Sequence, residues 1–334
     1  MNEIKCIFCE TLSDRIAIEE NGYQGKRCQK CGLIYISPRP SLNQIIDLYG
    51  HDDAHITAES HIADDFAKRL YAKHHLKIIS SVTNGGKLLE VGAGAGYFLD
   101  EARNAGFEPY GLEFNPVQAN FVRNELNIPC EESPLDHSVF AGKKFDVVYH
   151  CDVISHLFDP IADFKQMNQR MKDDSVLVLE TGNLGDVDPK YFDDIDCFQY
   201  PDHLFFFSTE NLVSLLKQTG FELINIHRYS ISPQLTTKKT LSKVKKAILT
   251  PLKSLKKKSN SPENITVSHQ TKKQNINRNQ SKSSISQKLK DAYLYSHRYF
   301  MYLLRYKLGS IVPKTNRPQT VIVIAKKVAS IQPG

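Results

Sequence analysis

Four cysteines form two pairs near the start of the chain. Each pair has the spacing C-x-x-C, and eighteen residues separate Cys6 and Cys9 from Cys28 and Cys31. Two such pairs match a tetrahedral four-thiolate zinc site, which would be structural because four thiolates leave no open coordination position. Disulfides are the alternative. The first residues lack a basic stretch followed by an apolar one, so we expect no secretory signal and a cytosolic location, which favours zinc.

A glycine-rich loop, EVGAGAG, ends the first strongly apolar run after the cysteine module. Glycines at Gly92, Gly94 and Gly96 let the backbone approach a ligand closely and a helix begin without a Cβ clash. Such a loop alone does not exclude a nicotinamide enzyme. Glu90, two positions before the first glycine, disfavours a pyrophosphate and favours a cation. The next apolar run ends in Glu113, the place for a carboxylate that binds ribose hydroxyls.

A third group of polar residues lies inside the aromatic run DCFQYPDHLFFFS, residues 196–208. Histidine can remove a proton from a hydroxyl near neutral pH, and we expect His203 to act as such a base. Asp202 or Asp194 would orient its imidazole, and Tyr200 would shape the substrate site or donate a hydrogen bond to the substrate. The alternative is that His203 only satisfies a backbone carbonyl in an ordered loop.

His156, in the stretch CDVISHLFDP, competes for the same role. It is expected to be a second base, a contact to cofactor or substrate, or a capping residue before the helix that Asp159 begins. We favour the contact to cofactor or substrate.

Alternating strands and helices must position these residues. From Lys87 onward, near-continuous apolar runs typical of buried strands alternate with amphipathic runs typical of helices. Strands are expected at 87–94, 108–114, 128–132, 144–151, 175–182 and 221–230, and helices at 97–106, 115–127, 159–173 and 209–220. Repeated β–α units imply a parallel sheet covered on both faces, a doubly wound α/β fold.

Four further segments surround this α/β unit. They are a zinc-binding module at 1–40, a helical connector or lid at 41–84, a basic insertion at 233–317, and a closing apolar run at 318–328 that would join the sheet. The connector is expected to hold helices at 42–49 and 58–82. The sheet domain would therefore comprise residues 85–232 plus the closing run.

The charge is concentrated in the last third of the chain. Residues 233–334 hold 22 lysines and arginines against two acidic residues, whereas residues 1–232 hold 21 against 35. The insertion is expected to contain amphipathic helices around a disordered centre. These helices would lie on an anionic membrane surface, bind RNA, or pack on their own domain. The apolar and aromatic residues of 289–308 favour the membrane surface over nucleic acid.

The stretches EVGAGAG, GLEF and FDVVYHCDVISHLFDP together resemble the class I S-adenosylmethionine (SAM)-dependent methyltransferases, over about residues 85–230 plus the closing run. The resemblance implies a seven-stranded Rossmann-like sheet whose last strand is antiparallel, with SAM as the cofactor. It also implies cofactor contacts from Tyr97, Glu132 and Asp152, in addition to Glu90, the three glycines and Glu113.

A narrower resemblance joins the cysteine module, CGLIYISPRP, the helices and YPDHLFFFS to the zinc-containing sugar methyltransferases and their relatives. That family has a Tyr-His-Glu-His segment followed by aromatic residues. Tyr200, Asp202 and His203 match it, whereas Pro201 departs from it, and the large C-terminal domain of the sugar C-methyltransferases is missing.

The resemblance leads to an expected function in polysaccharide biosynthesis. We expect methyl transfer to a hydroxyl of a sugar or glycan, nucleotide- or lipid-linked, by a cytoplasmic enzyme that contacts the inner face of the membrane peripherally. The alternatives are an RNA or protein methyltransferase tethered by the basic insertion, and a catalytically inactive binding scaffold.

Overall fold

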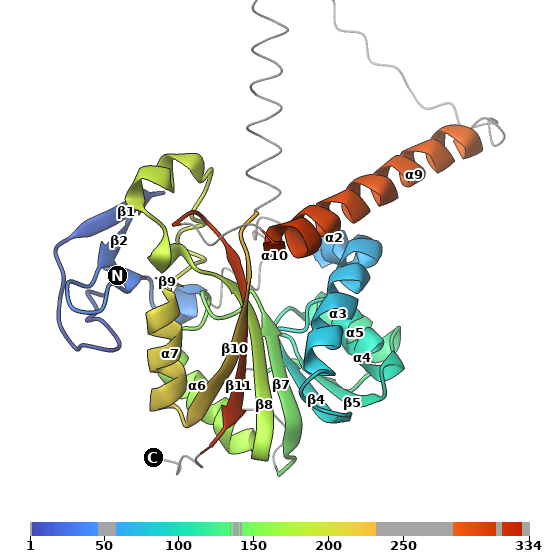
Figure 1. Ribbon diagram of the computed structural model, residues 1–334, viewed down its shortest axis with the longest axis horizontal. Helices are drawn as coiled ribbons and strands as arrows, with labels where there is room; N and C mark the ends of the chain where they lie inside the picture. Colours follow the sequence, from blue (N-terminus) through green and yellow to red (C-terminus); the bar gives the residue numbers. More distant parts are fainter. Residues whose placement is uncertain are drawn as a thin grey trace, which may run out of the picture. The chain divides into compact units, whose positions relative to one another are not determined.

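The central element of the protein is a seven-stranded sheet. The computed structural model describes residues 2–45, 58–133, 135, 140, 142–231, 283–311 and 316–328. The strands are β4 (Gly86–Val91), β5 (Phe107–Leu112), β6 (Cys130–Glu131), β7 (Phe145–Cys151), β8 (Met171–Gly182), β10 (Phe221–Tyr229) and β11 (Thr320–Lys327). They lie in the order β10-β11-β8-β7-β4-β5-β6 (Figure 1). Strands β4 to β8 pair in parallel, and β11 is antiparallel to both β8 and β10. The predicted α/β fold with an antiparallel last strand is confirmed.

Both faces of this sheet are covered by helices, so alternate residues of the central strands enter two separate cores. Leu88 and Val147 belong to one core, while their neighbours Leu89 and Val148 belong to the other, and all four are fully buried. The helices are α3 (Asp65–Ile79), α4 (Tyr97–Asn104) and α5 (Pro116–Asn124) on one face, with α6 (Pro160–Arg170) and α7 (Thr209–Gln218) on the other (Figure 1).

The predicted boundary between α6 and β8 was wrong. The helix expected at 159–173 ends at Arg170, and β8 begins at Met171 instead of residue 175. Met171 is buried and pairs with Phe145 of β7, so the sheet takes up a residue that helical periodicity alone placed on the helix. The helix start is as predicted, because the Asp159 side chain accepts a hydrogen bond from the Ala162 backbone N–H at 3.0 Å.

The N-terminal module is a second, antiparallel sheet. Its strands are β1 (Ile16–Glu20), β2 (Tyr23–Arg27) and β3 (Ile34–Ile36), and its fourth strand, β9 (Phe205–Phe206), comes from the segment after β8. In the β3–β9 pair, Ile34 lies opposite Phe206 and Tyr35 opposite Phe205. Part of the aromatic run is therefore an edge strand of the cysteine module.

The connector and insertion are described in part. Residues 42–45 are helical, α2 spans Ala58–Ala63, and the segment between them lies outside the described residues. In the insertion, α9 (Ser283–Tyr302) runs into a π-helical turn, η5 (Leu303–Leu308), and then α10 (Gly309–Ile311). The chain divides into two compact units, residues 1–232 with 302–334, and residues 233–301. The predicted disordered centre and first basic helix fall outside the described part of the insertion. No helix in the described part of the chain is long and apolar enough to span a bilayer.

Candidate active site

The loop after β4 requires glycine at two positions, because its backbone angles and its close neighbours exclude a side chain. Gly92 has φ +74°, and a Cβ there would lie 2.6 Å from a methyl group of Val153. Gly96 has φ +71°, and a Cβ there would lie 2.6 Å from a methyl group of Val122. Side chains at these positions would be strained and would collide with the neighbouring loop and helix. The glycine spacing in the sequence thus reflects close packing around the loop.

Two acidic residues stand beside this loop. Glu113 follows β5 and accepts hydrogen bonds from the backbone N–H groups of Gly94, at 2.6 Å, and Asn115, at 2.8 Å. Glu90 is only 5% exposed, and its Oε2 has no hydrogen-bond partner among the described residues. Burial, and then the charge of Glu113, raise the pKa of Glu90 well above its ordinary value. A buried carboxyl group with one oxygen left without a partner among the described residues, beside the glycine loop, fits a ligand that carries a positive charge.

The other predicted cofactor contacts are spread around the sheet edge. Tyr97 begins α4, and its hydroxyl donates to the Ile62 carbonyl at 2.5 Å, which ties the connector to the glycine loop. Glu132 is exposed and lies 3.7 Å from Arg123. Asp152 follows β7 with φ +54°, and its backbone N–H donates to the Glu180 carbonyl at 3.0 Å.

The loop after β7 and the aromatic run meet at the carboxyl end of the sheet. The Leu204 backbone N–H donates to the Ser155 carbonyl at 2.7 Å. His156 Nδ1 lies 3.0 Å from Asp202 Oδ1, and the rings of His156 and His203 are 4.7 Å apart, edge to face. The structure therefore brings together three of the four residues that the sequence nominates for catalysis.

Asp202, which the sequence assigns to His203, makes a 3.0 Å contact with His156, and its carboxylate also lies within 4.8 Å of a ring nitrogen of His203. Burial disfavours the charged imidazole, but the hydrogen bond and charge of Asp202 outweigh it, so the pKa of His156 is raised above its ordinary value. Asp152 also contributes its charge to that increase. Burial, and then the charge of Glu180, raise the pKa of Asp152 to about 6. A neutral histidine that donates from Nδ1 has its acceptor lone pair on Nε2, which is the atom that takes up a proton.

Tyr200, the fourth nominated residue, is 2% exposed. A Cβ on Gly25 of β2 would lie 1.9 Å from the Tyr200 hydroxyl, so the ring packs against the backbone of the N-terminal sheet. That hydroxyl has no hydrogen-bond partner among the described residues. The position of Tyr200 is that of a packing residue between the cysteine module and the aromatic run.

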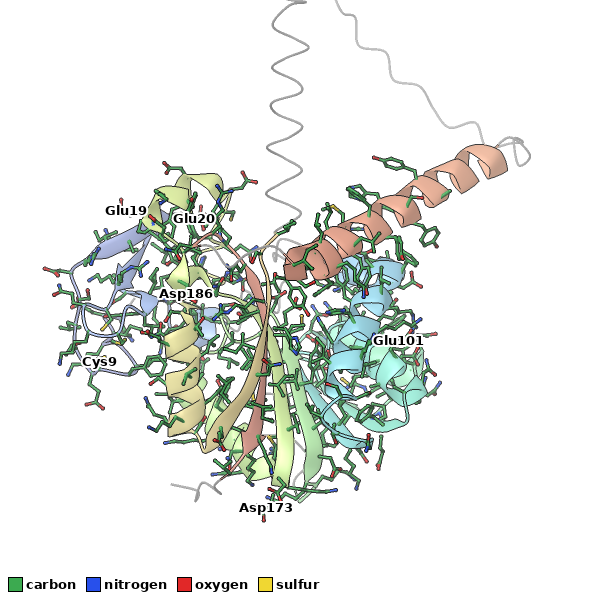
Figure 2. The ribbon with its side chains drawn as sticks, in the orientation of Figure 1. Cys9, Glu19, Glu20, Glu101, Asp173 and Asp186 are labelled. Carbon is green, nitrogen blue, oxygen red and sulfur yellow. The ribbon has the colours of Figure 1, made fainter. Side chains whose placement is uncertain are left out.

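The N-terminal module holds the aromatic run by its backbone. The two carboxylate oxygens of Glu20 accept from the N–H groups of Phe198, at 2.8 Å, and Tyr200, at 2.7 Å. Asn21 donates from its side chain to the Tyr200 carbonyl at 2.8 Å. Figure 2 labels Glu20 at the end of β1, beside the segment that follows β8. Together with the β3–β9 pairing, these bonds fix the residues on either side of Asp202 and His203.

The four paired cysteines of the N-terminal module lie close together. The sulfur atoms of Cys6, Cys9, Cys28 and Cys31 all lie within 4.8 Å of one another. The sulfurs of Cys6 and Cys31 are 3.5 Å apart. Zinc–sulfur bonds of about 2.3 Å in a tetrahedron require sulfur separations of roughly 3.8 Å, so the arrangement fits a four-thiolate metal site. The Cys31 carbonyl accepts from the Asn211 side chain at 3.0 Å, which connects this cluster to α7.

One group of polar residues was missed by sequence reasoning. Glu180 of β8 is 2% exposed, and its carboxylate lies 2.7 Å from His75 Nε2 and 2.8 Å from the Tyr306 hydroxyl. A glutamate inside the apolar run SVLVLETG was the available signal, because a buried acid requires partners.

Comparisons with known proteins give one family match and several partial relatives. Residues 63–226 match the model of a family described as a methyltransferase domain. A tRNA U34 carboxymethyltransferase of Helicobacter hepaticus is 29% identical over 112 residues, 29% of this chain and 35% of that protein. A ubiquinone biosynthesis O-methyltransferase of Haemophilus ducreyi is 28% identical over 109 residues, 30% of this chain and 46% of that protein. The chain thus spans less than half the length of either relative.

Solved structures are similar at lower sequence identity. A SAM-dependent methyltransferase from Archaeoglobus fulgidus has 18% identity and a TM-score of 0.45, covering 77% of this chain and 93% of that one. Coclaurine N-methyltransferase has 12% identity and a TM-score of 0.45, covering 84% and 76%. The residues of the family match include the glycine loop, Glu90, Glu113, His156 and His203. Residues 63–226 thus carry the similarity to the methyltransferase domain family.

Proposed function

We propose that the protein transfers the methyl group of SAM to a hydroxyl, with His156 as the general base and Asp202 as its partner. The observation that carries the proposal is the 3.0 Å contact between His156 Nδ1 and Asp202 Oδ1, beside the end of β7. A hydroxyl must lose its proton when it attacks, and a histidine oriented by a carboxylate is suited to take it. His203, whose ring lies 4.7 Å from that of His156, would contact the acceptor.

The residues of the chain would bind and align the reactants. SAM supplies an electrophilic methyl group on a sulfonium. Glu90, buried beside the glycine loop, would be the counter-charge for a cationic part of the ligand, and Glu113 would accept from hydroxyl groups. Asp152, which follows β7, would add its negative charge near His156. Methyl transfer depends mainly on alignment of the two reacting atoms, so fixed loops favour it.

For the acceptor we propose a sugar or glycan, linked to a nucleotide or a lipid. The support is that the chain combines a cysteine module with the segment YPDHLFFFS. The two are joined by the hydrogen bonds that the Phe198 and Tyr200 backbone N–H groups donate to Glu20. The names of the relatives favour a second class, since one acts on tRNA and another in ubiquinone biosynthesis. A tRNA base or a phenolic hydroxyl is therefore the competing acceptor.

We propose that the four cysteines hold one structural zinc ion. Their sulfurs lie within 4.8 Å of one another, and four thiolates complete the coordination of zinc. Its task would be to keep the module folded, so that Glu20 and β3 hold the segment carrying Asp202 and His203.

A peripheral contact with an anionic membrane is our proposal for α9. Its exposed large side chains include Tyr293, at 73%, Phe300, at 53%, and Leu294, Tyr295 and Tyr299, each at 49%. The same helix holds Lys288, Lys290 and Arg298 against one acid, Asp291, a net charge of +2. Aromatic and basic side chains on one helix favour the interface of anionic lipids. Flotation with vesicles of phosphatidylcholine and phosphatidylglycerol tests this: the protein should co-float, and a variant with Tyr293, Leu294 and Phe300 changed to Ser should not. Equal flotation of both proteins would contradict the proposal.

Transfer of a radiolabelled methyl group tests the function. The purified protein is incubated with methyl-labelled SAM and separate pools of nucleotide sugars, lipid-linked glycans, tRNA and catechol-type phenols. We expect label in a sugar or glycan pool, with His156→Gln reducing the rate by roughly 10² or more and His203→Gln reducing it less. Label in tRNA or phenols would overturn the acceptor class. Equal rates for wild type and His156→Gln, with both folded, would overturn the assignment of the base.

A further inference from the structure

A buried ionic cluster connects the end of the insertion to the end of β7. The Tyr306 hydroxyl donates to Glu180 Oε2 at 2.8 Å, and Arg305 Nη1 lies 3.7 Å from Glu180 Oε1. His75 of α3 completes the cluster, with Nε2 at 2.7 Å from Glu180 and Nδ1 at 2.6 Å from the Tyr149 hydroxyl. Glu180 is thus surrounded by donors from α3 and from the end of the insertion, two parts of the chain that are distant from it in sequence.

Glu180 is also joined to the turn at the end of β7. Its carbonyl accepts from the Asp152 backbone N–H at 3.0 Å. The Cys151 sulfur lies 3.9 Å from Glu180 Oε1 and 3.9 Å from Asp152 Oδ2. Burial opposes the charge on Glu180, but His75, Arg305 and the Tyr306 hydroxyl lower its pKa below the ordinary value. The carboxylate is therefore kept ionised beneath the turn that leads to His156.

The π-helical turn is itself fixed to the methyltransferase domain. The Tyr306 ring is buried, and its centre lies 4.2 Å from that of His74 and 4.9 Å from that of Tyr229. The Ser230 backbone N–H donates to the Gly309 carbonyl at 3.1 Å. An inserted π turn is a common way to present side chains at a functional site. Here it directs both Arg305 and Tyr306 onto Glu180.

We infer that Arg305 and Tyr306, at the end of the insertion, are positioning residues of the reaction site: through Glu180 they hold the Cys151–Asp152 turn. The inference rests on the proposed function in taking that turn as part of the site. The insertion is then required for an ordered site, in addition to any contact that α9 makes. Sequence position alone gives no indication of this, since 124 residues separate Glu180 from Arg305.

Amide hydrogen exchange of the full-length protein, without SAM or acceptor, tests the inference. Tyr306→Phe removes only the hydroxyl, and Arg305→Met replaces the charged guanidinium by an uncharged, unbranched side chain. Each should speed exchange at residues 150–156 by roughly tenfold, as expected for loss of a bond to a buried carboxylate. Arg305→Lys should restore slow exchange. Lys307→Met is the matched control, because Lys307 is exposed in the same turn. Exchange in β5 serves as the internal reference for global unfolding.

The outcomes separate this inference from the proposed function. Unchanged exchange at residues 150–156 in both Tyr306→Phe and Arg305→Met, with intact unfolding transitions, would overturn the inference. Failure to find a methyl acceptor would leave the exchange result as it stands. Where turnover is available, Tyr306→Phe should lower kcat with little change in KM, whereas a change in KM alone would also count against a positioning role.

Discussion

His156 and Asp202 are 46 positions apart in the sequence, and Nδ1 of the histidine lies 3.0 Å from Oδ1 of the aspartate. They come from the loops that follow β7 and β8, two neighbouring parallel strands. The carboxyl ends of such strands lie at one edge of the sheet, where α/β proteins bind their ligands. The pair thus combines a titratable base with an orienting carboxylate at the expected edge.

Replacement of Asp202 by Asn should move the acid limb of the kcat/KM profile to lower pH. Asp202 raises the pKa of His156, and the base acts only when deprotonated, so loss of the carboxylate lets His156 lose its proton at lower pH. The maximal rate should fall roughly tenfold or more, because the imidazole loses its orientation. Initial rates between about pH 5 and 9 measure both effects. Asp196→Asn, in the same segment but exposed, is the control. An acid limb that stays in place would rule out His156 as the titrating base.

Binding of SAM should release a proton from Glu90. Burial raises the pKa of this acid and so favours its protonated form in the free protein, whereas a cationic ligand favours the ionised form. SAM affinity should therefore increase with pH. Calorimetry in buffers of different ionisation enthalpy measures the number of protons released, which we expect to be about one. Glu90→Gln should bind SAM more weakly and without proton release. Proton release that persists in Glu90→Gln would assign it to another group.

Loss of the metal should disorder the aromatic run. Cys28→Ser removes one ligand and should reduce bound zinc from about one per chain to near zero. Because Glu20 and β3 hold residues 198–206, limited proteolysis should then cut within 196–208. Cys197→Ser, at an exposed thiol in that run, is the control and should keep both the zinc and the protease resistance. A zinc-free Cys28→Ser protein that resists cleavage would contradict the proposed support.

A methyl group on Gly25 should destabilise the domain through Tyr200. The Cβ would overlap the Tyr200 hydroxyl, at 1.9 Å, and approach the ring carbon that carries it, at 3.0 Å. Gly25→Ala should cost about 1–3 kcal/mol in the free energy of unfolding, measured in urea. Tyr200→Phe, which removes a buried hydroxyl without a partner among the described residues, should be neutral or stabilising by up to about 1 kcal/mol.

The double variant decides the role of Tyr200. Gly25→Ala with Tyr200→Phe should recover part of the lost stability, because the oxygen is removed from the collision. Tyr200→Phe alone should keep normal turnover if the ring only packs. A large loss of kcat in Tyr200→Phe would instead support the catalytic role that the sequence suggested.

The sequence by itself determined the features that depend on local spacing. The glycine loop, Glu90, Glu113 and the cysteine pairs each follow from residues close together in the chain, as does the alternation of strands and helices that predicts the sheet. The antiparallel last strand was expected only through the family resemblance. The end of the helix at Arg170 was not predicted, because it depends on the pairing of Met171 with Phe145 of another strand, which local spacing does not reveal.

Tertiary structure alone decided which polar residues meet. Asp202 could be assigned to a histidine from the sequence, but the choice of His156 depends on how the loops after β7 and β8 pack together. From its place in the sequence Tyr200 was expected to be catalytic, but its hydroxyl packs against Gly25 of the neighbouring strand β2. The partners of Glu180 come from α3 and from the end of the insertion, and no repeating pattern in the sequence predicts that these positions meet. Such partners follow from long-range packing, because a side chain's pKa and its function depend on its neighbours in space.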